Sequence, residues 1–169
     1  VGGQVVRGAT GNAGEVGHLT VTGEGPRCAC GRRGDVESFA GGAAIARRAH
    51  RAWPRATMPD GSPAPRTPEA VFAAARAGDQ QAKSIVDDAA EALSVALAAL
   101  TAALEPEAIV VGGSIGLAQP RFLRRATTLA RRRVLAELGR SMRVLPAALG
   151  AESVLAGAAH LAARSLGSA

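Results

Sequence analysis

A short segment near the start of the chain gathers residue types that bind metal ions and polar small molecules. His18 lies ten residues before Cys28, and Cys30 is the second of the only two cysteines in the chain. Sulfur and imidazole ligands at short loop spacing are those of a tetrahedral zinc site. Glu15 and Glu37 flank the segment, and carboxylates accept hydrogen bonds from the hydroxyl groups of a sugar. The segment therefore predicts a metal site beside a sugar site.

This segment resembles the signature of the ROK family, which comprises sugar kinases and sugar-responsive repressors. The family pattern is Gly-Glu-x-Gly-His followed, after a spacer, by Cys-x-Cys-Gly-x-x-Gly-Cys-x-Glu. The chain has GEVGH at residues 14–18 and CACGRRGDVE at residues 28–37. One position departs from the pattern, because Asp35 stands where the family has its third cysteine. The resemblance covers the C-terminal half of the family's chain and implies an actin-like (ribonuclease H-like) α/β ATPase-type lobe.

The resemblance implies a zinc site with His18, Cys28, Cys30 and Asp35 as ligands. Aspartate is an acceptable zinc ligand at about 2.0–2.2 Å, but it is harder than a thiolate, so we expect a lower affinity than with a third cysteine. The two cysteines are one residue apart and are poorly placed to form a disulfide with each other. The alternative is a metal-free loop with two buried thiols, in which case residues 23–34 would be mobile.

The resemblance also implies that Glu15, His18 and Glu37 contact the hydroxyl groups of the sugar. One ring nitrogen of His18 would face the metal and the other the sugar. A metal-bound loop would hold His18 and Glu37 in place without taking part in the chemistry. The alternative is that Glu15 and Glu37 only cap a turn and a helix, and the expected position of Glu37 at a helix start suits that role.

Residues 105–118, EPEAIVVGGSIGLA, resemble the strand and turn that contact the nucleotide in this family, in the form closest to bacterial N-acetylmannosamine kinases. The resemblance places the adenosine part of ATP against Gly112 and Gly113, with Mg²⁺ as the companion ion. Glycines after a strand let a ligand approach the backbone closely, although a tight strand-to-helix turn has the same sequence. A third stretch, residues 149–159, resembles the closing helix of the family.

The composition predicts one lobe with a real core, because 47% of its 169 residues are hydrophobic. The net charge of +6 invites a nucleic-acid partner. Lys83 is the only lysine, however, and no aromatic residues alternate with the basic ones, so we expect nucleic-acid binding only if a helix-turn-helix lies upstream. No signal peptide or membrane span is recognisable, and the predicted location is the reducing cytoplasm.

The single lobe is predicted to have three parts: a zinc and sugar loop (residues 14–37), a helical part (residues 36–104) and a nucleotide-side α/β part (residues 107–166). Capping and periodicity set the expected elements. Their order after the first loop favours α/β layering. The expected helices are residues 36–51, 68–78, 80–104, 120–138 and 151–166, and the expected strands are residues 19–22, 108–111 and 142–145, with a hairpin remnant at residues 1–6.

The sequence predicts a sugar-binding lobe, and three functions remain open. The first is the C-terminal lobe of an ATP-dependent kinase for an N-acylhexosamine such as N-acetylmannosamine. The second is the sugar-sensing domain of a ROK repressor, and the third is a degenerate paralogue or assembly module. Kinases of this family need a phosphate loop and a catalytic aspartate, which we expect upstream of Val1 in a longer protein. We therefore expect the 169-residue chain alone to phosphorylate nothing, and we expect a homo-oligomer, as is common in the family.

Overall fold

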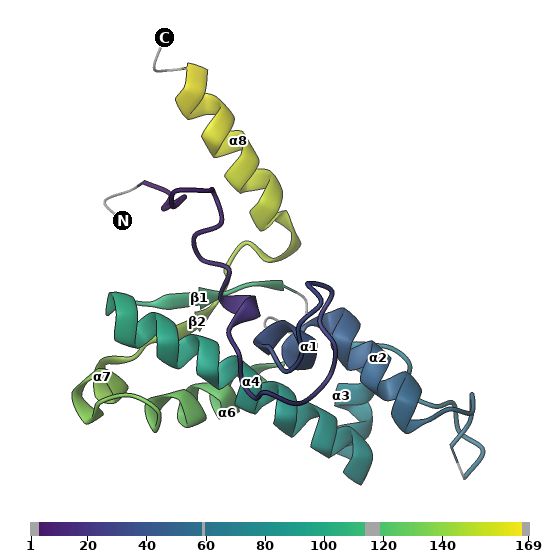
Figure 1. Ribbon diagram of the computed structural model, residues 1–169. Helices are drawn as coiled ribbons and strands as arrows, with labels where there is room; N and C mark the ends of the chain where they lie inside the picture. Colours follow the sequence, from purple (N-terminus) through teal and green to yellow (C-terminus); the bar gives the residue numbers. More distant parts are fainter. Residues whose placement is uncertain (1–3, 59, 114–118, 167–169) are drawn as a thin grey trace.

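The computed structural model describes residues 4–58, 60–113 and 119–166 (Figure 1). Two sequence-based predictions, the turn at residues 1–3 and residues 114–118 of the Gly-rich turn, lie outside the described residues. The elements are η1 (Val16–His18), α1 (Val36–Ala40), α2 (Gly42–Ala52), α3 (Pro68–Ala77), α4 (Gln80–Leu104), β1 (Ile109–Val111), α6 (Pro120–Arg131), α7 (Ala136–Ser141), β2 (Val144–Pro146), η2 (Gly150–Glu152) and α8 (Ser153–Leu166).

The core is built around the long helix α4, which contacts α1, α2, α3 and α6. Its predicted apolar face is confirmed, because Ile85 and Leu97 are buried together with alanines at helical spacing. The small alanine side chains let the neighbouring helices approach closely. Phe72 of α3 and Phe122 of α6 meet edge to face beside α4, with ring centroids 5.3 Å apart. The core therefore fixes the helices on which the site residues stand.

Local capping sets the limits of the two best-predicted helices. Thr67 caps α3 by accepting a hydrogen bond from the Ala70 N–H, and Pro68 occupies the first turn. Gly78 ends α3 in the left-handed region, at φ 107°. The Asp79 carboxylate then caps α4 at 2.7 Å from the Ala82 nitrogen. Both helices match the sequence prediction, because each capping residue acts on the helical turn next to it.

Several other boundaries were wrong. Residues 36–51 form two helices, because Gly41 adopts an extended conformation and its N–H bonds to the Glu37 carbonyl. The predicted helix over residues 120–138 breaks after Arg131, where Arg133 turns back to bond Ser94 on α4 at 2.9 Å. The last helix begins two residues later than predicted, after the short turn η2.

The strands are shorter and less buried than predicted. β1 and β2 form a parallel two-stranded sheet in which Ile109 pairs with Val144. Ile109, Val111 and Val144 pack against the helical core on one face, whereas Val110 is 62% exposed on the other. The predicted strand at residues 19–22 is reduced to a single bridge, Thr20 to Asp35, and residues 4–6 form no strand. The parallel sheet with helices on one face confirms the predicted α/β layering.

Helix α8 projects away from the helical layer, and the N-terminal segment lies on the same side (Figure 1). The side chains of α8 from residue 154 to residue 163 are all exposed, including the large apolar Val154, Leu155 and Leu161. Within the described part of the chain, no helix is both long enough and apolar enough to cross a membrane.

We expect that replacing Glu105 with glycine stabilises the chain by about 0.5–1 kcal/mol. Glu105 follows α4 in the left-handed region at φ 41°, and it is the only such non-glycine residue in the described part of the chain. Glycine adopts this conformation without the steric cost of a Cβ atom. Denaturant unfolding followed by circular dichroism measures the change. Glu107→Gly is the control at a nearby exposed position, and stabilisation by both variants would contradict this explanation.

Candidate functional site

The loop between η1 and α1 folds into a compact turn that carries both cysteines. An isolated bridge joins Arg27 to Arg33, and the Cys28 N–H donates to the Arg32 carbonyl at 2.8 Å. Gly31 and Gly34 both lie in the left-handed region, at φ 91° and 67°. A Cβ atom on Gly34 would lie 2.1 Å from the Thr22 carbonyl oxygen. The turn thus depends on the glycines that the sequence motif contains.

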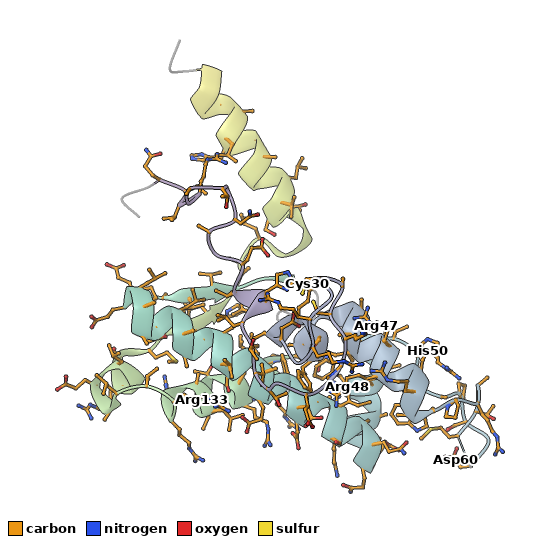
Figure 2. All side chains as sticks on the ribbon, in the orientation of Figure 1. Cys30, Arg47, Arg48, His50, Asp60 and Arg133 are labelled. Carbon is orange, nitrogen blue, oxygen red and sulfur yellow. The ribbon has the colours of Figure 1, made fainter. Side chains whose placement is uncertain are left out.

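This turn brings the four predicted metal ligands together. His18, Cys28, Cys30 and Asp35 each offer one donor atom, and the four atoms all lie within 4.8 Å of one another. Cys28 and Asp35 are buried, His18 is half-buried and Cys30 is exposed. Figure 2 shows Cys30 beside α1, at the side of the helical layer from which α8 projects. The cluster therefore lies at the protein surface, with Cys30 exposed and with Cys28 and Asp35 buried beneath it.

Three distances between donor atoms of the cluster are close to those expected around one metal ion shared by all four ligands. Ligands at zinc–ligand distances of about 2.0–2.3 Å in tetrahedral geometry lie about 3.3–3.8 Å from one another. His18 Nδ1 lies 3.6 Å from Cys28 Sγ and 3.2 Å from Asp35 Oδ2. Cys30 Sγ lies 3.5 Å from the same Asp35 oxygen. Two sulfurs, one imidazole nitrogen and one carboxylate oxygen form a donor set that zinc accepts.

The opposite nitrogen of His18 faces the two predicted sugar-binding carboxylates. Its Nε2 atom lies 3.7 Å from Glu15 Oε2 and 3.7 Å from Glu37 Oε2. The side chains of Glu15 and Glu37 are 65% and 52% exposed, so hydroxyl groups of a ligand can reach them. The structure therefore places His18 between a metal-type donor set and a polar open surface.

Hydrogen bonds shift the pKa values of the four groups in the cluster. The Asp35 contact raises the pKa of His18. Burial opposes ionisation of Asp35, but hydrogen bonds from Cys28, the Ser38 N–H and His18 outweigh it and hold the pKa of that carboxyl well below its usual range. The same carboxylate raises the pKa of Cys28 to about 11. A backbone hydrogen bond from Arg32 lowers the pKa of Cys30, so Cys30 is the more readily ionised thiol.

Without metal, these shifts predict a window of pH in which the cluster stabilises the fold. The lowered pKa of Asp35 gives stability that is present above 3.8 and lost as the pH falls through the folded-state value. The raised pKa of His18 gives stability that is present below 6.5 and lost as the pH rises through its folded-state value. Both contributions are therefore complete between pH 3.8 and 6.5.

We expect the melting temperature of the EDTA-treated chain to exceed that of Asp35→Asn most strongly inside this window. The difference should narrow at more acidic pH, where Asp35 takes up a proton on unfolding, and at more alkaline pH, where His18 releases a proton on unfolding. Thermal melts from pH 2 to pH 9 measure it. A difference that does not vary with pH would show that Asp35 acts through packing alone.

Two residues at the site were not predicted from the sequence. Arg32 donates from Nη2 to the His18 carbonyl at 3.2 Å, a contact for which the sequence carries no signal. Ser38 is buried and bonds Asp35 twice. An aspartate just before a helix is a recognisable N-cap signal, but it does not indicate a serine at the third helical position.

The predicted nucleotide turn forms a second location, at the carboxyl end of β1. The strand ends at Val111, and Gly112 and Gly113 follow with exposed backbones. Gly113 lies in the left-handed region at φ 84°, and a Cβ atom built there would meet nothing within 4 Å. The backbone here is accessible to a ligand, as the prediction requires, while residues 114–118 lie outside the described residues.

Comparison with known proteins identifies relatives along nearly the whole chain. The model of the ROK family matches residues 1–165. A glucokinase of Pyrobaculum calidifontis is 35% identical over 96% of this chain and 52% of its own length. An N-acetylmannosamine kinase of Citrobacter koseri is 38% identical over 69% of this chain and 37% of its own length. The chain thus spans about half the length, or less, of these relatives.

Solved structures agree with this assignment. A ROK family glucokinase from Streptomyces griseus, in complex with glucose and AMPPNP, matches with a TM-score of 0.75 and 32% identity over 95% of this chain and 55% of that one. A ROK family transcriptional regulator, a homologue of the Escherichia coli MLC protein, matches with a TM-score of 0.67 and 26% identity over 85% of this chain and 37% of that one. The predicted actin-like α/β fold is confirmed by the likeness to ROK kinases.

Proposed function

This chain belongs to the ROK family, and on that basis we propose that it is the C-terminal lobe of an ATP-dependent kinase acting on an N-acylhexosamine such as N-acetylmannosamine. The observation that supports this proposal most directly is the position of His18. Its Nε2 atom lies 3.7 Å from both Glu15 and Glu37, and its Nδ1 atom faces the two cysteines and Asp35. Carboxylates and an imidazole on one open surface offer mixed acceptors and donors to neighbouring hydroxyl groups.

We propose that zinc occupies the cluster of His18, Cys28, Cys30 and Asp35. Zinc here would serve as a structural ion that ties the cysteine turn to η1 and α1. Held in this way, His18 keeps one ring orientation, so that Nε2 points to the open side. Glu15 and Glu37 then accept hydrogen bonds from the sugar while the imidazole orients a third hydroxyl group.

The nucleotide is assigned to the turn after β1. We propose that Gly112 and Gly113 contact the adenosine part of ATP, whose Mg²⁺ neutralises charge on the phosphates. The bare, left-handed backbone at Gly113 supports this role. Phosphoryl transfer also needs groups that cradle the phosphates and a base for the sugar hydroxyl. We propose that these lie in the half of the kinase that this chain does not span, and that the chain alone transfers no phosphate.

A sugar-sensing domain of a ROK repressor is the second candidate. The likeness to the MLC-like regulator favours it, because the same lobe occurs in that protein. A repressor would bind the sugar through Glu15, His18 and Glu37 without phosphorylating it. In either role we propose a cytoplasmic homo-oligomer, which light scattering coupled to size-exclusion chromatography tests directly.

Assays on the whole protein distinguish the kinase from the repressor. We expect it to convert ATP to ADP in the presence of N-acetylmannosamine, and to do so more slowly with glucose. Coupled ADP detection measures the rate, and calorimetry with the same sugars measures binding separately. Sugar binding without any phosphate transfer would reject the kinase in favour of the repressor, and no binding of either sugar would reject both.

A further inference from the structure

The carboxylate of Asp35 serves two structures at once. Its Oδ1 atom accepts a hydrogen bond from the Ser38 N–H at 2.8 Å and so caps helix α1. Its Oδ2 atom lies 3.2 Å from His18 Nδ1 and 3.5 Å from Cys30 Sγ, inside the metal-type cluster. The residue is only 1% exposed, so neither oxygen exchanges its partners freely for water. One buried carboxylate therefore joins the cluster to the first turn of a helix.

Ser38 fixes the orientation of this carboxylate. Its hydroxyl donates to the Asp35 carbonyl oxygen at 2.8 Å, and its own N–H donates to Oδ1. Ser38 is also 1% exposed, so both bonds are protected from solvent. Asp35 is further held by its bridge to Thr20. With the backbone and one carboxylate oxygen fixed, the second oxygen is directed at His18 and Cys30.

Helix α1 depends on this cap more than a longer helix would. It has only five residues, Val36–Ala40, and ends at the extended Gly41. Helices this short do not stand alone, so the cap and the tertiary contacts decide whether the first turn is ordered. Glu37, in this first turn, directs Oε2 to within 3.7 Å of His18 Nε2. The order of α1 therefore sets the position of one of the proposed sugar contacts.

We propose that Asp35 couples metal occupancy to the order of α1, with Ser38 as the residue that positions it. The coupling rests on the proposed zinc site. A cysteine at position 35 can ligate zinc through its thiolate, but it has no separate oxygen for the Ser38 N–H, and its one sulfur is only a weak acceptor. The aspartate that departs from the family pattern thus provides one oxygen for the cluster and a separate oxygen for the helix cap. Zinc then orders the helix that carries Glu37, and sugar affinity rises with metal occupancy.

Two substitutions at position 35 separate the two roles. Asp35→Asn keeps a good helix cap but loses the anionic ligand. We therefore expect zinc affinity to fall at least about tenfold. Hydrogen exchange at the Ser38 amide in the metal-free chain should change little. Asp35→Cys replaces the carboxylate with a softer anionic ligand but loses the oxygen cap. We therefore expect zinc affinity to be retained or raised, and exchange at the Ser38 amide to rise about fivefold. At saturating zinc, exchange at Ser38 should remain faster in Asp35→Cys than in the unchanged chain.

Ser38→Ala tests the positioning role with every proposed ligand and sugar contact intact. We expect its zinc affinity, measured by competition with a chromophoric chelator, to fall about tenfold. Ser94→Ala is the matched control, because Ser94 is also a fully buried serine that bonds a backbone carbonyl in a helix. Asp79→Asn is the control for the carboxylate, because Asp79 caps α4 in the same way outside the cluster. Neither control should alter zinc affinity.

The outcomes distinguish failure of the coupling from failure of the metal site. If the unchanged chain binds no zinc, the proposed site is wrong and the coupling is lost with it. If zinc binds but leaves exchange at the Ser38 amide unchanged, the site stands and the coupling is rejected. The same rejection follows if Asp35→Asn and Asp35→Cys alter zinc affinity and exchange in parallel. The coupling is supported when zinc slows exchange at the Ser38 amide of the unchanged chain and the two variants at position 35 separate zinc affinity from exchange.

Discussion

Replacing Cys30 with serine is expected to lower the affinity of the chain for zinc at least about 100-fold. A serine hydroxyl keeps its proton near neutral pH and is not among the ligands that zinc prefers, so only three donors remain. Cys30 is the better of the two cysteines for this test, because it is exposed while Cys28 is 7% exposed and packs inside. Competition with a chelator gives the affinity, and metal analysis of the purified chain gives the stoichiometry.

His160→Ala is the control for this experiment, since His160 is an exposed histidine on α8, outside the cluster. We expect it to bind zinc like the unchanged chain, at about one ion per chain for a single four-ligand site. Retention of zinc by Cys30→Ser would mean that the ion is held elsewhere or by fewer ligands. Absence of zinc from the unchanged chain after incubation with excess metal would favour the alternative of a metal-free loop, and would weaken the assignment of Glu37 to the sugar.

The clustering of the candidate site residues was predictable from the sequence because they are concentrated in one segment. His18, the two cysteines and Asp35 stand close enough in sequence that a single turn gathers them, and the motif glycines make that turn. The placing of His18 between the metal-type cluster and the flanking glutamates was an implication of the family resemblance. Ser38 was missed because its importance depends on which carboxylate oxygen of Asp35 it binds, and residue types alone do not give that information.

The fold was predictable only where signals were local. Thr67 and Asp79 mark the starts of α3 and α4 because an N-cap acts within its own turn. The prediction that β1 is buried was wrong, because Val110 is 62% exposed. Whether this face of the strand is covered depends on segments distant in sequence, which the residues of the strand do not reveal. The break after Arg131 depends on a bond from Arg133 to Ser94, 39 positions away, which no periodicity reveals. Non-local contacts therefore account for these two errors, whereas the break at Gly41 has a local cause.

The last expected result concerns the sugar site. Replacing Glu37 with glutamine should weaken sugar binding roughly 10- to 100-fold, because a hydrogen bond to a charged acceptor contributes about 1.5–3 kcal/mol. The substitution keeps the size of the side chain but removes the charge that favours hydroxyl donors and the contact with His18. Calorimetry with N-acetylmannosamine on the zinc-loaded whole protein measures the loss.

Glu69→Gln is a closely matched control for this substitution. Glu69 occupies the same position in the first turn of α3 that Glu37 occupies in α1, one residue after the first helical residue in each case. Both carboxylates interact favourably with the helix dipole, and each variant should lose about 0.3–1 kcal/mol of stability for that reason. Of the Glu37 and Glu69 carboxylates, only that of Glu37 lies near His18, with Oε2 3.7 Å from His18 Nε2. A loss of sugar affinity in Glu37→Gln alone separates recognition from helix stabilisation, whereas unchanged affinity would leave Glu37 a capping acid and nothing more.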